Sequence, residues 1–419
     1  MSKLDELIKE LCPNGVEYKE LGEIVKSQRG KTITKELIKD GDIPVISGGQ
    51  KPAYYHNESN RKGEVITVAG SGAYAGFVMY WDKPIFVSDA FSIECDKSYL
   101  NIKYIYYFLQ NNQMKIHSLK KGGGVPHVYF KDMQKFLVPV PPLEVQNEIV
   151  RILDNFTALT AELTAELTVR KKQYSWYRDY LLKFENKVEI VKLKDIATEM
   201  YRGNGIKREE VRETGIPCVR YGEIYTEYGI AFEKTKSYTD ENLITNKKYI
   251  DYGDILFAIT GESVEEIGKS TAYIGKEKCL VGGDILVMKH KQDPVYLSYV
   301  LSTENAQKQK SKGKIKSKVV HTNATDIGEI EIPLPPLEVQ KRIVEVLDNF
   351  EKICNDLNIG LPAEIEARQK QYEFYRNFLL TFNNEEIYAL SKQASKQASK
   401  QASKQASKQA SKQASKPKI

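Results

Sequence analysis

Apolar side chains recur at alternating spacings of four and three residues along the middle of this chain. The ten positions are Ile149, Leu153, Phe156, Thr160, Leu163, Leu167, Arg170, Tyr174, Tyr177 and Leu181. Eight of these ten are apolar or aromatic, which is the heptad pattern of a helix that buries one stripe against another helix. Residues 143–183 are therefore predicted to form one helix of about 60 Å, at a rise of about 1.5 Å per residue.

The same pattern returns near the end of the chain. It begins with Ile343, Leu347, Phe350, Cys354 and Leu357. It then meets Gly360-Leu361-Pro362 and continues as AEIEARQKQYEFYRNFLL. Because proline lacks an N–H and its ring crowds the preceding helical turn, we expect this second helix to kink or break at residues 360–362.

Both helices begin with a duplicated segment. PPLEVQNEIVRILDNF (141–156) is repeated as PPLEVQKRIVEVLDNF (335–350), with 12 of 16 positions identical. Two helices with apolar stripes most simply bury those stripes against each other. Each helix leads out of one globular segment, so an antiparallel pair is expected, holding two similar domains a fixed distance apart. A repeat of nearly 200 residues is too long for a solenoid.

The segments between the helices are rich in short strand patterns separated by turns, such as GEVITVAGSG in the first and GGDILVMK in the second. The predicted fold class is α+β: two mixed α/β domains separated by two long antiparallel coiled-coil helices, with a pseudo-twofold internal repeat. The predicted boundaries are an N-terminal helix (1–20), a first domain (21–140), a first spacer helix (141–185), a second domain (186–334), a second spacer helix (335–384) and a low-complexity SKQA tail (385–419), expected to be disordered.

The net charge of +6 comes from the tail, since residues 391–419 carry eight lysines and no acid. The rest of the chain has 54 basic and 56 acidic residues, so any polyanion-binding surface must come from local clustering. Five scattered cysteines without a CxxC pair argue against a disulfide framework or zinc site and favour a reducing cytoplasm. No apolar run is long enough to span a bilayer, and no signal peptide is recognised at the start.

Two segments resemble catalytic motifs, but the residues around them do not fit those motifs. Gly70, Gly72 and Ala75 fit G-x-G-x-x-A after a strand, but GFVMYWDKPIF reads as another strand where a dinucleotide site needs a helix. GESVEEIGKST (261–271) ends like a phosphate loop, but its required first glycine falls on Ser263. No metal-ligand cluster, nucleophile–base set or methyltransferase signature is recognised. The chain is therefore expected to bind and not to catalyse.

Basic and amide side chains gather in particular segments. The first domain has 16 basic and 11 acidic residues, with loops SQRGKTITK (27–35), SGGQKPAYYHN (47–57) and LKKGGGVPH (119–127). Gln and Asn pair with adenine, Arg pairs with guanine, and Gly lets the backbone approach a phosphate. In the second domain, lysines 308, 310, 312, 314, 316 and 318 alternate, so an extended backbone would place all six on one face. The alternatives are ordinary turns and a solvated loop.

Two histidines and two aspartates share a register ahead of the proline-rich helix entries. They are His127 with His321, and Asp132 with Asp326. The histidines are candidates for DNA contact. They are equally interpreted as core residues packed beside a helix that the aspartate caps.

The duplicated PPLEVQ…LDNF and KQY…YR…LL helices, alternating with two variable domains, resemble the DNA-specificity subunit of type I restriction–modification systems over about residues 1–385. The resemblance implies a chain without catalysis or a cofactor of its own, in which each domain is a target-recognition domain for one half of a bipartite duplex DNA sequence. It implies two modification subunits that methylate adenine with S-adenosylmethionine. Restriction subunits would then join for translocation driven by ATP with Mg.

Positional matching between the two domains gives candidate DNA-contacting residues. The loop after the strand in GDIPVISGGQ supplies Ser47, Gly49, Gln50 and Lys51, and the loop after the strand in GIPCVRYGEI supplies Arg220, Tyr221 and Glu223. Second candidates are Gln28, Arg29, Lys31, Tyr201, Arg202 and Asn204, and the lysine comb adds Lys314, Lys316 and Lys318.

Two other functions compete with this interpretation. A stand-alone coiled-coil scaffold that bridges DNA would have no modification partner, and its helices would present ordinary solvent-exposed outer faces. Trp176, Arg178, Tyr180, Phe374 and Arg376 lie beyond the apolar stripes, as a partner-docking surface would require. An enzyme using the Gly70 loop would bind a nucleotide as an isolated chain.

The first spacer helix contains a tandem tetrapeptide, LTAELTAELT (159–168). Four residues make about 6 Å of helix and about 40° of rotation, close to two base-pair rises of about 3.4 Å. Similar repeats in the resembled family set the length of the unread gap. We predict that deleting one TAEL shortens the gap and leaves both half-sites unchanged, as read from the methylated sequence. An altered half-site with an unchanged gap would contradict this mechanism.

Overall fold

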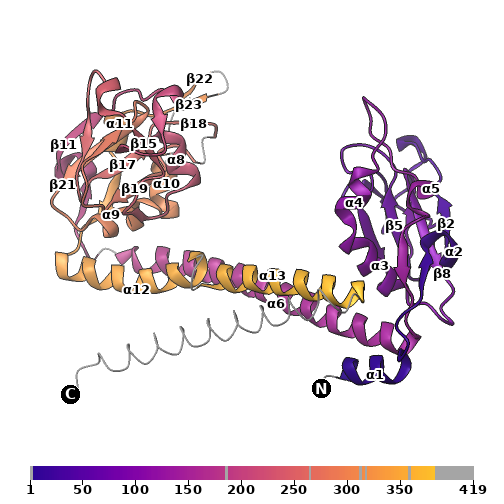
Figure 1. Cartoon of the computed structure of the whole chain (residues 1–419). Coiled ribbons are helices and arrows are strands. Elements are labelled where there is room, and N and C mark those ends of the chain that lie inside the picture. The colour runs from indigo at the N-terminus through magenta and orange to yellow at the C-terminus, as the bar shows by residue number, and fades with distance from the viewer. Residues whose placement is uncertain are drawn as a thin grey trace, which may run out of the picture. The chain divides into compact units, whose positions relative to one another are not determined.

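The structure is a computed structural model that describes residues 3–184, 187–263, 266–310, 314–316, 319–356 and 360–382. The SKQA tail, predicted to be disordered, lies outside these residues. Two compact units divide the chain: residues 1–162 with 366–419 form unit 1, and residues 163–365 form unit 2. Each unit combines one strand-rich domain with segments of long helix (Figure 1). None of the described helices is long and apolar enough to cross a membrane.

Unit 1 contains the first domain and the start of the first long helix. Its helices are α1 (Lys3–Leu11), α2 (Leu21–Ile24), η1 (Lys35–Leu37), α3 (Ile102–Asn111), α4 (Gln113–Ser118) and α5 (Phe130–Met133). Its strands are β1 (Tyr18–Glu20), β2 (Val25–Arg29), β3 (Ile43–Ile46), β4 (Tyr54–His56), β5 (Val65–Ala69), β6 (Val78–Trp81), β7 (Phe86–Val87), β8 (Ala90–Cys95) and β9 (Leu137–Pro139). They form sheets in the orders β2-β8-β5-β6, β4-β3-β7 and β1-β9.

Unit 2 contains the second domain. Its helices within that domain are α7 (Leu193–Ile196), η3 (Arg208–Glu210), α8 (Tyr221–Thr226), η4 (Glu241–Leu243), α9 (Pro294–Leu301), α10 (Glu304–Lys310) and α11 (Ala324–Gly328). Its strands are β10 (Ile190–Lys192), β11 (Ala197–Arg202), β12 (Val211–Arg212), β13 (Ile216–Val219), β14 (Ala231–Phe232), β15 (Ser237–Thr239), β16 (Tyr249–Ile250), β17 (Ile255–Ala258), β18 (Thr260–Gly261), β19 (Ser270–Tyr273), β20 (Cys279–Val281), β21 (Ile285–His290), β22 (Lys314–Lys316), β23 (Val319–His321) and β24 (Glu331–Pro333). The sheet orders are β11-β21-β17-β19-β14, β12-β15-β13-β20-β16, β18-β23-β22 and β10-β24.

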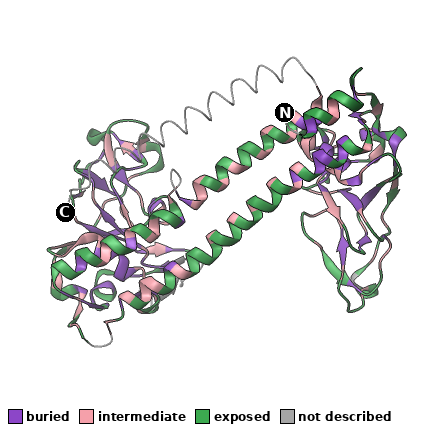
Figure 2. Cartoon of the chain, turned by 90° about the horizontal axis from the view of Figure 1, so that it is seen from below, coloured by how far each residue is buried: buried purple, intermediate pink, exposed green. Residues whose placement is uncertain are grey.

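The two domains repeat one topology. β1 pairs with β9 at the base of the first domain, and β10 pairs with β24 at the base of the second, both antiparallel. A short parallel pair then recurs, β3 with β7 and β13 with β20. The central strands β5 and β17 are buried along their whole length, and Figure 2 shows buried residues concentrated in the strands of both domains. The predicted α+β class and internal repeat are confirmed.

The long helices follow the predicted pattern closely. The first, α6, runs over Leu143–Leu181. The second is interrupted: α12 (Leu337–Asn355) ends before α13 (Leu361–Thr381) begins, so Pro362 lies in a first turn, where its missing N–H costs nothing. Nine of the ten predicted stripe positions of α6 are buried or half-buried, and Arg170 is the exposed one. Figure 2 shows the outer faces of these helices as mostly exposed.

Each unit pairs two helical segments in antiparallel fashion. In unit 1, the ring of Phe156 on α6 stacks on Tyr375 of α13, with 5.3 Å between ring centroids. In unit 2, Tyr177 of α6 stacks on Phe350 of α12, with 5.6 Å between centroids. These aromatic pairs agree with the antiparallel packing of the two helices that the repeated heptad pattern predicted.

A buried glutamine from the duplicated segment ties each domain to its helix. Gln146 accepts from the backbone N–H of Asn101 (2.8 Å) and donates to the carbonyl of Pro141 (2.7 Å). Gln340 repeats both bonds, with Asp293 (3.1 Å) and with Pro335 (2.8 Å). Because both glutamines make the same bonds, the PPLEVQ segment has the same structural role in each half of the chain.

A tyrosine–aspartate hydrogen bond holds each domain to its helix at a second point, about two helical turns beyond the glutamine. Tyr107 of α3 donates to Asp154 (2.6 Å) in the first LDNF segment. Tyr299 of α9 donates to Asp348 (2.7 Å) in the second. Each domain is thus held to its following helix by the same two bonds, which fix its orientation on that helix.

We predict that Gln340→Leu destabilises the chain, because it leaves the N–H of Asp293 and the carbonyl of Pro335 buried without partners. The free energy of unfolding in urea should fall by about 1–3 kcal/mol. Lys341→Ala changes the exposed neighbour on the same helix and should have little effect. Equal unfolding midpoints for the two variants would contradict the role given to the glutamine.

Candidate nucleic-acid interface

Several loops of the first domain converge on the connection between β7 and β8. We call the set formed by residues 28–31, 46–51, 70–71 and 87–90 the first loop edge. Its backbone bonds are Gly30 N to Ala90 O (2.8 Å), Lys31 N to Val87 O (2.9 Å), Ser88 N to Ile46 O (2.7 Å) and Gly70 N to Asp89 O (3.1 Å). These bonds bring the candidates after β2 and those after β3 to one place.

The second domain repeats this arrangement bond for bond. We call the set formed by residues 201–204, 219–223, 259–261 and 281–285 the second loop edge. Its bonds are Gly203 N to Ile285 O (2.9 Å), Asn204 N to Val281 O (3.1 Å), Gly282 N to Val219 O (2.8 Å) and Ile259 N to Asp284 O (3.1 Å). Arg29 therefore corresponds to Arg202, and Ser47 corresponds to Arg220.

One glycine in each loop edge permits this close approach. A Cβ on Gly30 would lie 2.0 Å from the carbonyl oxygen of Ser88, and a Cβ on Gly203 would lie 2.1 Å from that of Gly282. Both distances are well inside van der Waals contact, so no other residue fits without a backbone shift. The sequence signal for this equivalence is the Arg-Gly pair in each domain, where the arginine ends a strand and the glycine follows it.

Side chains on the first loop edge are open to solvent. Gln28, Arg29, Lys31, Gln50 and Lys51 are exposed, whereas Ser47 and Gly49 are half-buried. Within the described ranges, no side chain bonds to the charged groups of the arginine and the two lysines. This edge therefore presents three cationic groups and two amides that are available to a ligand.

A buried arginine supports the first loop edge from inside. Arg61 is only 7% exposed, and its guanidinium donates to the carbonyls of Gln28 (3.3 Å) and Arg29 (3.1 Å) and to Ser92 Oγ (2.7 Å). Burial lowers the pKa of Arg61, although the charge of Glu94 opposes that shift. Sequence reasoning missed this residue, because its role depends on a strand more than 30 positions away.

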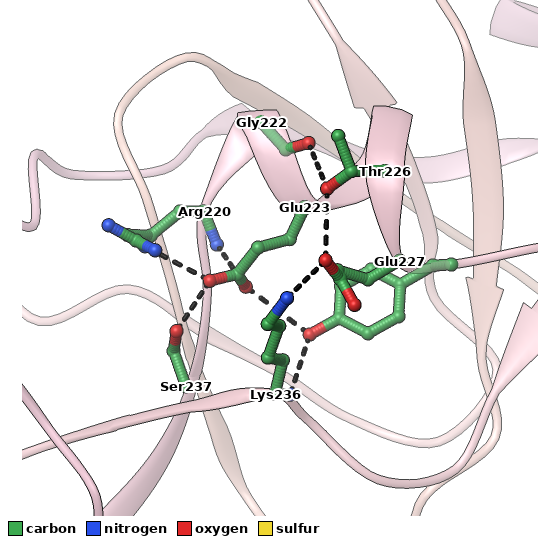
Figure 3. Close-up of polar contacts among 8 residues, drawn as sticks. Arg220, Gly222, Glu223, Thr226, Glu227, Lys236 and Ser237 are labelled. Atoms are coloured by element: carbon green, nitrogen blue, oxygen red, sulfur yellow. Dashed lines mark hydrogen bonds and ion pairs between the residues drawn. The ribbon is translucent and has the colours of Figure 1, made fainter. Parts of the chain in front are cut away.

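The second loop edge differs from the expectation at Tyr221 and Glu223. The predicted loop is the helix α8, with Arg220 at its N-cap. Glu223 is 4% exposed, and its carboxylate accepts bonds from Arg220 N (3.2 Å), Arg220 Nε (3.0 Å), Tyr228 OH (3.3 Å) and Ser237 Oγ (Figure 3). Glu223 therefore holds Arg220 in place and has no free oxygen facing solvent, whereas Tyr221 is 41% exposed.

A second set of bonds surrounds this buried carboxylate. The backbone N–H of Lys236 donates to Tyr228 OH (3.0 Å), and the Lys236 ammonium pairs with Glu227, the C-cap residue of α8 (Figure 3). Thr226 donates to the carbonyl of Gly222 (3.2 Å). The residue before β15 is thereby fixed against the end of α8. Arg220 keeps part of its guanidinium at the half-exposed rim.

The remaining candidates of the second loop edge are only partly free. Tyr201 is half-buried, and its hydroxyl donates to the carbonyl of Tyr249. Arg202 is exposed and pairs with Asp284, with 2.5 Å between Nη2 and Oδ1. Asn204 is half-buried beside Gly203.

The proposed lysine comb is wrong in its first part. Lys308 and Lys310 lie in α10, so these positions are helical and not extended. Lys310 is buried, and its ammonium donates to Leu301 O (2.7 Å) and Ser270 Oγ (3.2 Å). Burial lowers the pKa of Lys310 to about 7. An every-second-lysine pattern could not reveal that one member belongs to the core.

The later lysines of the comb are only partly described. Lys314 and Lys316 lie in β22, which is extended as expected, but their side chains lie outside the described set. Lys312 and Lys318 lie outside the described residues altogether. Whether these lysines contact DNA stays a prediction.

The paired histidines lie on equivalent β-bridges. His127 pairs with Lys121, and His321 pairs with Lys314 in the β22–β23 hairpin. The ring of His127 stacks on Tyr129, with 5.9 Å between centroids, and His321 is exposed. His127 is half-buried and His321 is exposed, so neither histidine is a buried core residue.

The two aspartates do not cap their helices as expected. Asp132 and Asp326 lie within the first turns of α5 and α11, whose N-caps are Tyr129 and Asn323. The segment after Gly70 and Gly72 enters the strand β6, as the rejection of a dinucleotide site expected.

Substituting the close-approach glycine should disturb the second loop edge. We predict that Gly203→Ala lowers the free energy of unfolding by about 1–3 kcal/mol through overpacking and weakens binding to duplex DNA. Gly205→Ala is the matched control, because a Cβ there meets nothing within 4 Å. Similar stability and binding for the two variants would show that the contact is not needed.

Comparison with known proteins identifies the family to which this chain belongs. The family described as type I restriction modification DNA specificity domain matches residues 13–169 and 185–367. The chain is 30% identical over 413 residues to the specificity subunit of the type I restriction enzyme EcoR124I/EcoR124II of Escherichia coli, covering 92% of this chain and 99% of that relative. It is 27% identical over 340 residues to the specificity subunit of the type I restriction enzyme MjaVIII of Methanocaldococcus jannaschii, covering 75% and 78%.

Solved structures show the same fold. The S subunit of a type I restriction–modification system from M. genitalium aligns with a TM-score of 0.54 and 16% identity, covering 88% of this chain and 97% of that one. A chain from a structure of type I R-M complex assembly aligns with a TM-score of 0.56 and 16% identity, covering 89% and 98%. Since the family match covers more than half of the sequence, this chain belongs to the family of type I restriction–modification DNA specificity subunits.

Proposed function

We propose that this chain is a non-catalytic subunit that reads a bipartite duplex DNA sequence, with one half-site read by each loop edge. The observation that carries this proposal is the repetition of one backbone arrangement with different side chains. The four backbone bonds of the first loop edge recur in the second. The residues displayed on them differ, as two unrelated half-sites would require.

The chemistry of the displayed side chains suits base and phosphate contact. Gln28 and Gln50 carry amides that can pair with adenine, and Arg29, Arg202 and Arg220 carry the planar fork that pairs with guanine. Lys31 and Lys51 offer charge to phosphates, which positions a protein on the duplex without specifying sequence. Glu223 is assigned a positioning role in this proposal, because its oxygens are already occupied.

Exposed aromatic residues on the helices support the proposal that partner subunits bind there. Trp176 and Tyr180 of α6 are 60% and 58% exposed and stack on each other, with 5.2 Å between centroids. Their equivalents on α13, Phe374 and Phe378, also stack, but both are half-buried, and Phe378 packs against the core of the first domain. The exposed pair on α6 fits one modification subunit, and we assign the half-buried equivalent pair on α13 to the second one.

The start of α12 offers a further apolar surface. Val145 of α6 is fully buried in the core cluster that α1 joins, but the identical Val339 of α12 is 38% exposed. Leu337 and Val346 of α12 are 47% and 46% exposed. The unequal burial of the identical Val145 and Val339 indicates a face of α12 that another chain covers in the assembled complex.

The proposal places all chemistry in the partner subunits. Adenine methylation with S-adenosylmethionine, and translocation and cleavage with ATP and Mg, would belong to modification and restriction subunits in the cytoplasm. A stand-alone DNA-bridging scaffold is not favoured, because relatives that match 92% and 75% of this chain are specificity subunits of type I restriction enzymes.

Methylation mapping tests this proposal. Cells that express the chain with its modification subunits should carry methyladenine in one bipartite motif, and deletion of the gene should abolish methylation at that motif alone. Gln50→Ala should alter only one half of the motif, because it changes one loop edge. Methylation that is unchanged by the deletion would contradict the proposal.

A further inference from the structure

The two loop edges hold an equivalent arginine and aspartate in different pairings. Arg29 is opposite Phe91 in the β2–β8 ladder, and Arg202 is opposite Leu286 in the β11–β21 ladder. The backbone carbonyls of Asp89 and Asp284 accept equivalent hydrogen bonds, from the N–H groups of Gly70 and Ile259. Asp89 and Asp284 therefore occupy equivalent backbone positions relative to Arg29 and Arg202.

In the second domain, the Asp284 carboxylate forms an ion pair with Arg202. The Nη2 of Arg202 lies 2.5 Å from Oδ1 of Asp284, and the Nε–H of Arg202 donates to the carbonyl of Gly283. These two anchors on neighbouring residues fix both the position and the plane of the guanidinium. Thr260, the residue after Ile259, bonds with His321 (3.2 Å) and leaves Asp284 to the arginine.

In the first domain, the Asp89 carboxylate bonds to a residue other than Arg29. Asp89 accepts a hydrogen bond from Ser71, which is the equivalent of Thr260. No side chain in the described part of the chain holds the guanidinium of Arg29. The same backbone thus presents one arginine that is oriented and one that is not.

The anchored guanidinium retains the donors that base recognition needs. Arginine has five N–H donors, and the bonds to Gly283 and Asp284 use two of them. A bidentate contact with O6 and N7 of guanine needs two parallel donors, which the Nη1 and Nη2 groups still supply. Fixing the side chain beforehand removes rotamer entropy that binding would otherwise cost.

We propose that Asp284 is a positioning residue that orients Arg202 to read one guanine, whereas Asp89 gives no such orientation to Arg29. The inference rests on the proposed function and adds the base that the second loop edge selects. A surface ion pair of this kind contributes little to stability, so folding alone gives no reason for the pairing. Its geometry matters if the guanidinium must meet a base edge.

Selection from a duplex library tests this inference. The full chain, assembled with its modification subunits, is incubated with duplexes of randomised sequence, and the bound fraction is sequenced. Asp284→Asn should relax preference at a single G·C pair in one half-site, by about ten- to hundredfold, without weakening binding to unselected duplexes. Arg202→Lys keeps the charge but removes the fork, so it should relax the same pair.

Glu329→Gln is the matched control. It removes a surface carboxylate of the second domain that pairs with Lys192 and Lys194 and lies outside the loop edge, so it should leave both half-sites unchanged. The inference is overturned if Asp284→Asn leaves the motif intact, if it lowers affinity for every duplex equally, or if Glu329→Gln relaxes the same G·C pair to the same extent. If the unaltered assembly selects no bipartite motif, the proposed function fails as well.

Discussion

A buried glutamine amide at the start of each long helix is the interaction on which the rest of the architecture depends. Gln146 and Gln340 each bond to a backbone N–H of the domain and to a proline carbonyl of the helix entry. Buried amides must be paired, because an unpaired one costs about 1–3 kcal/mol. The domain is therefore held to its helix in one orientation, and the loop edge that it carries is oriented with it.

This constraint separates what must stay the same from what is free to vary. The glutamine, the tyrosine–aspartate bond and the close-approach glycine recur in both domains, because each solves the same packing problem. The exposed side chains on the loop edges do not solve a packing problem of this kind, whereas the buried Arg61 and Glu223 support the edges from inside. The proposed reading of two half-sites would use this division, because displayed side chains can change while the backbone that carries them is retained.

The helices could be predicted from sequence because a heptad stripe is a local and periodic signal. Every stripe residue of α6 except Arg170 is buried or half-buried, and Pro362 marks the start of α13. The loop edges could be predicted in position, since glycines and strand ends align between the domains. Their chemistry could not be predicted in full, because it depends on burial by distant strands. Glu223 is occupied by Ser237 and Tyr228, and Lys310 is a core residue within an apparently exposed lysine run.

The central claim is that both loop edges face the bases of one duplex. A structure of the chain assembled with modification subunits on its own DNA target tests it most directly. The account predicts that residues 28–31 and 47–51 lie against one half-site, and that residues 201–204 and 220–221 lie against the other, in the major groove. A duplex bound to another face of either domain, with its loop edge left in solvent, would contradict the account.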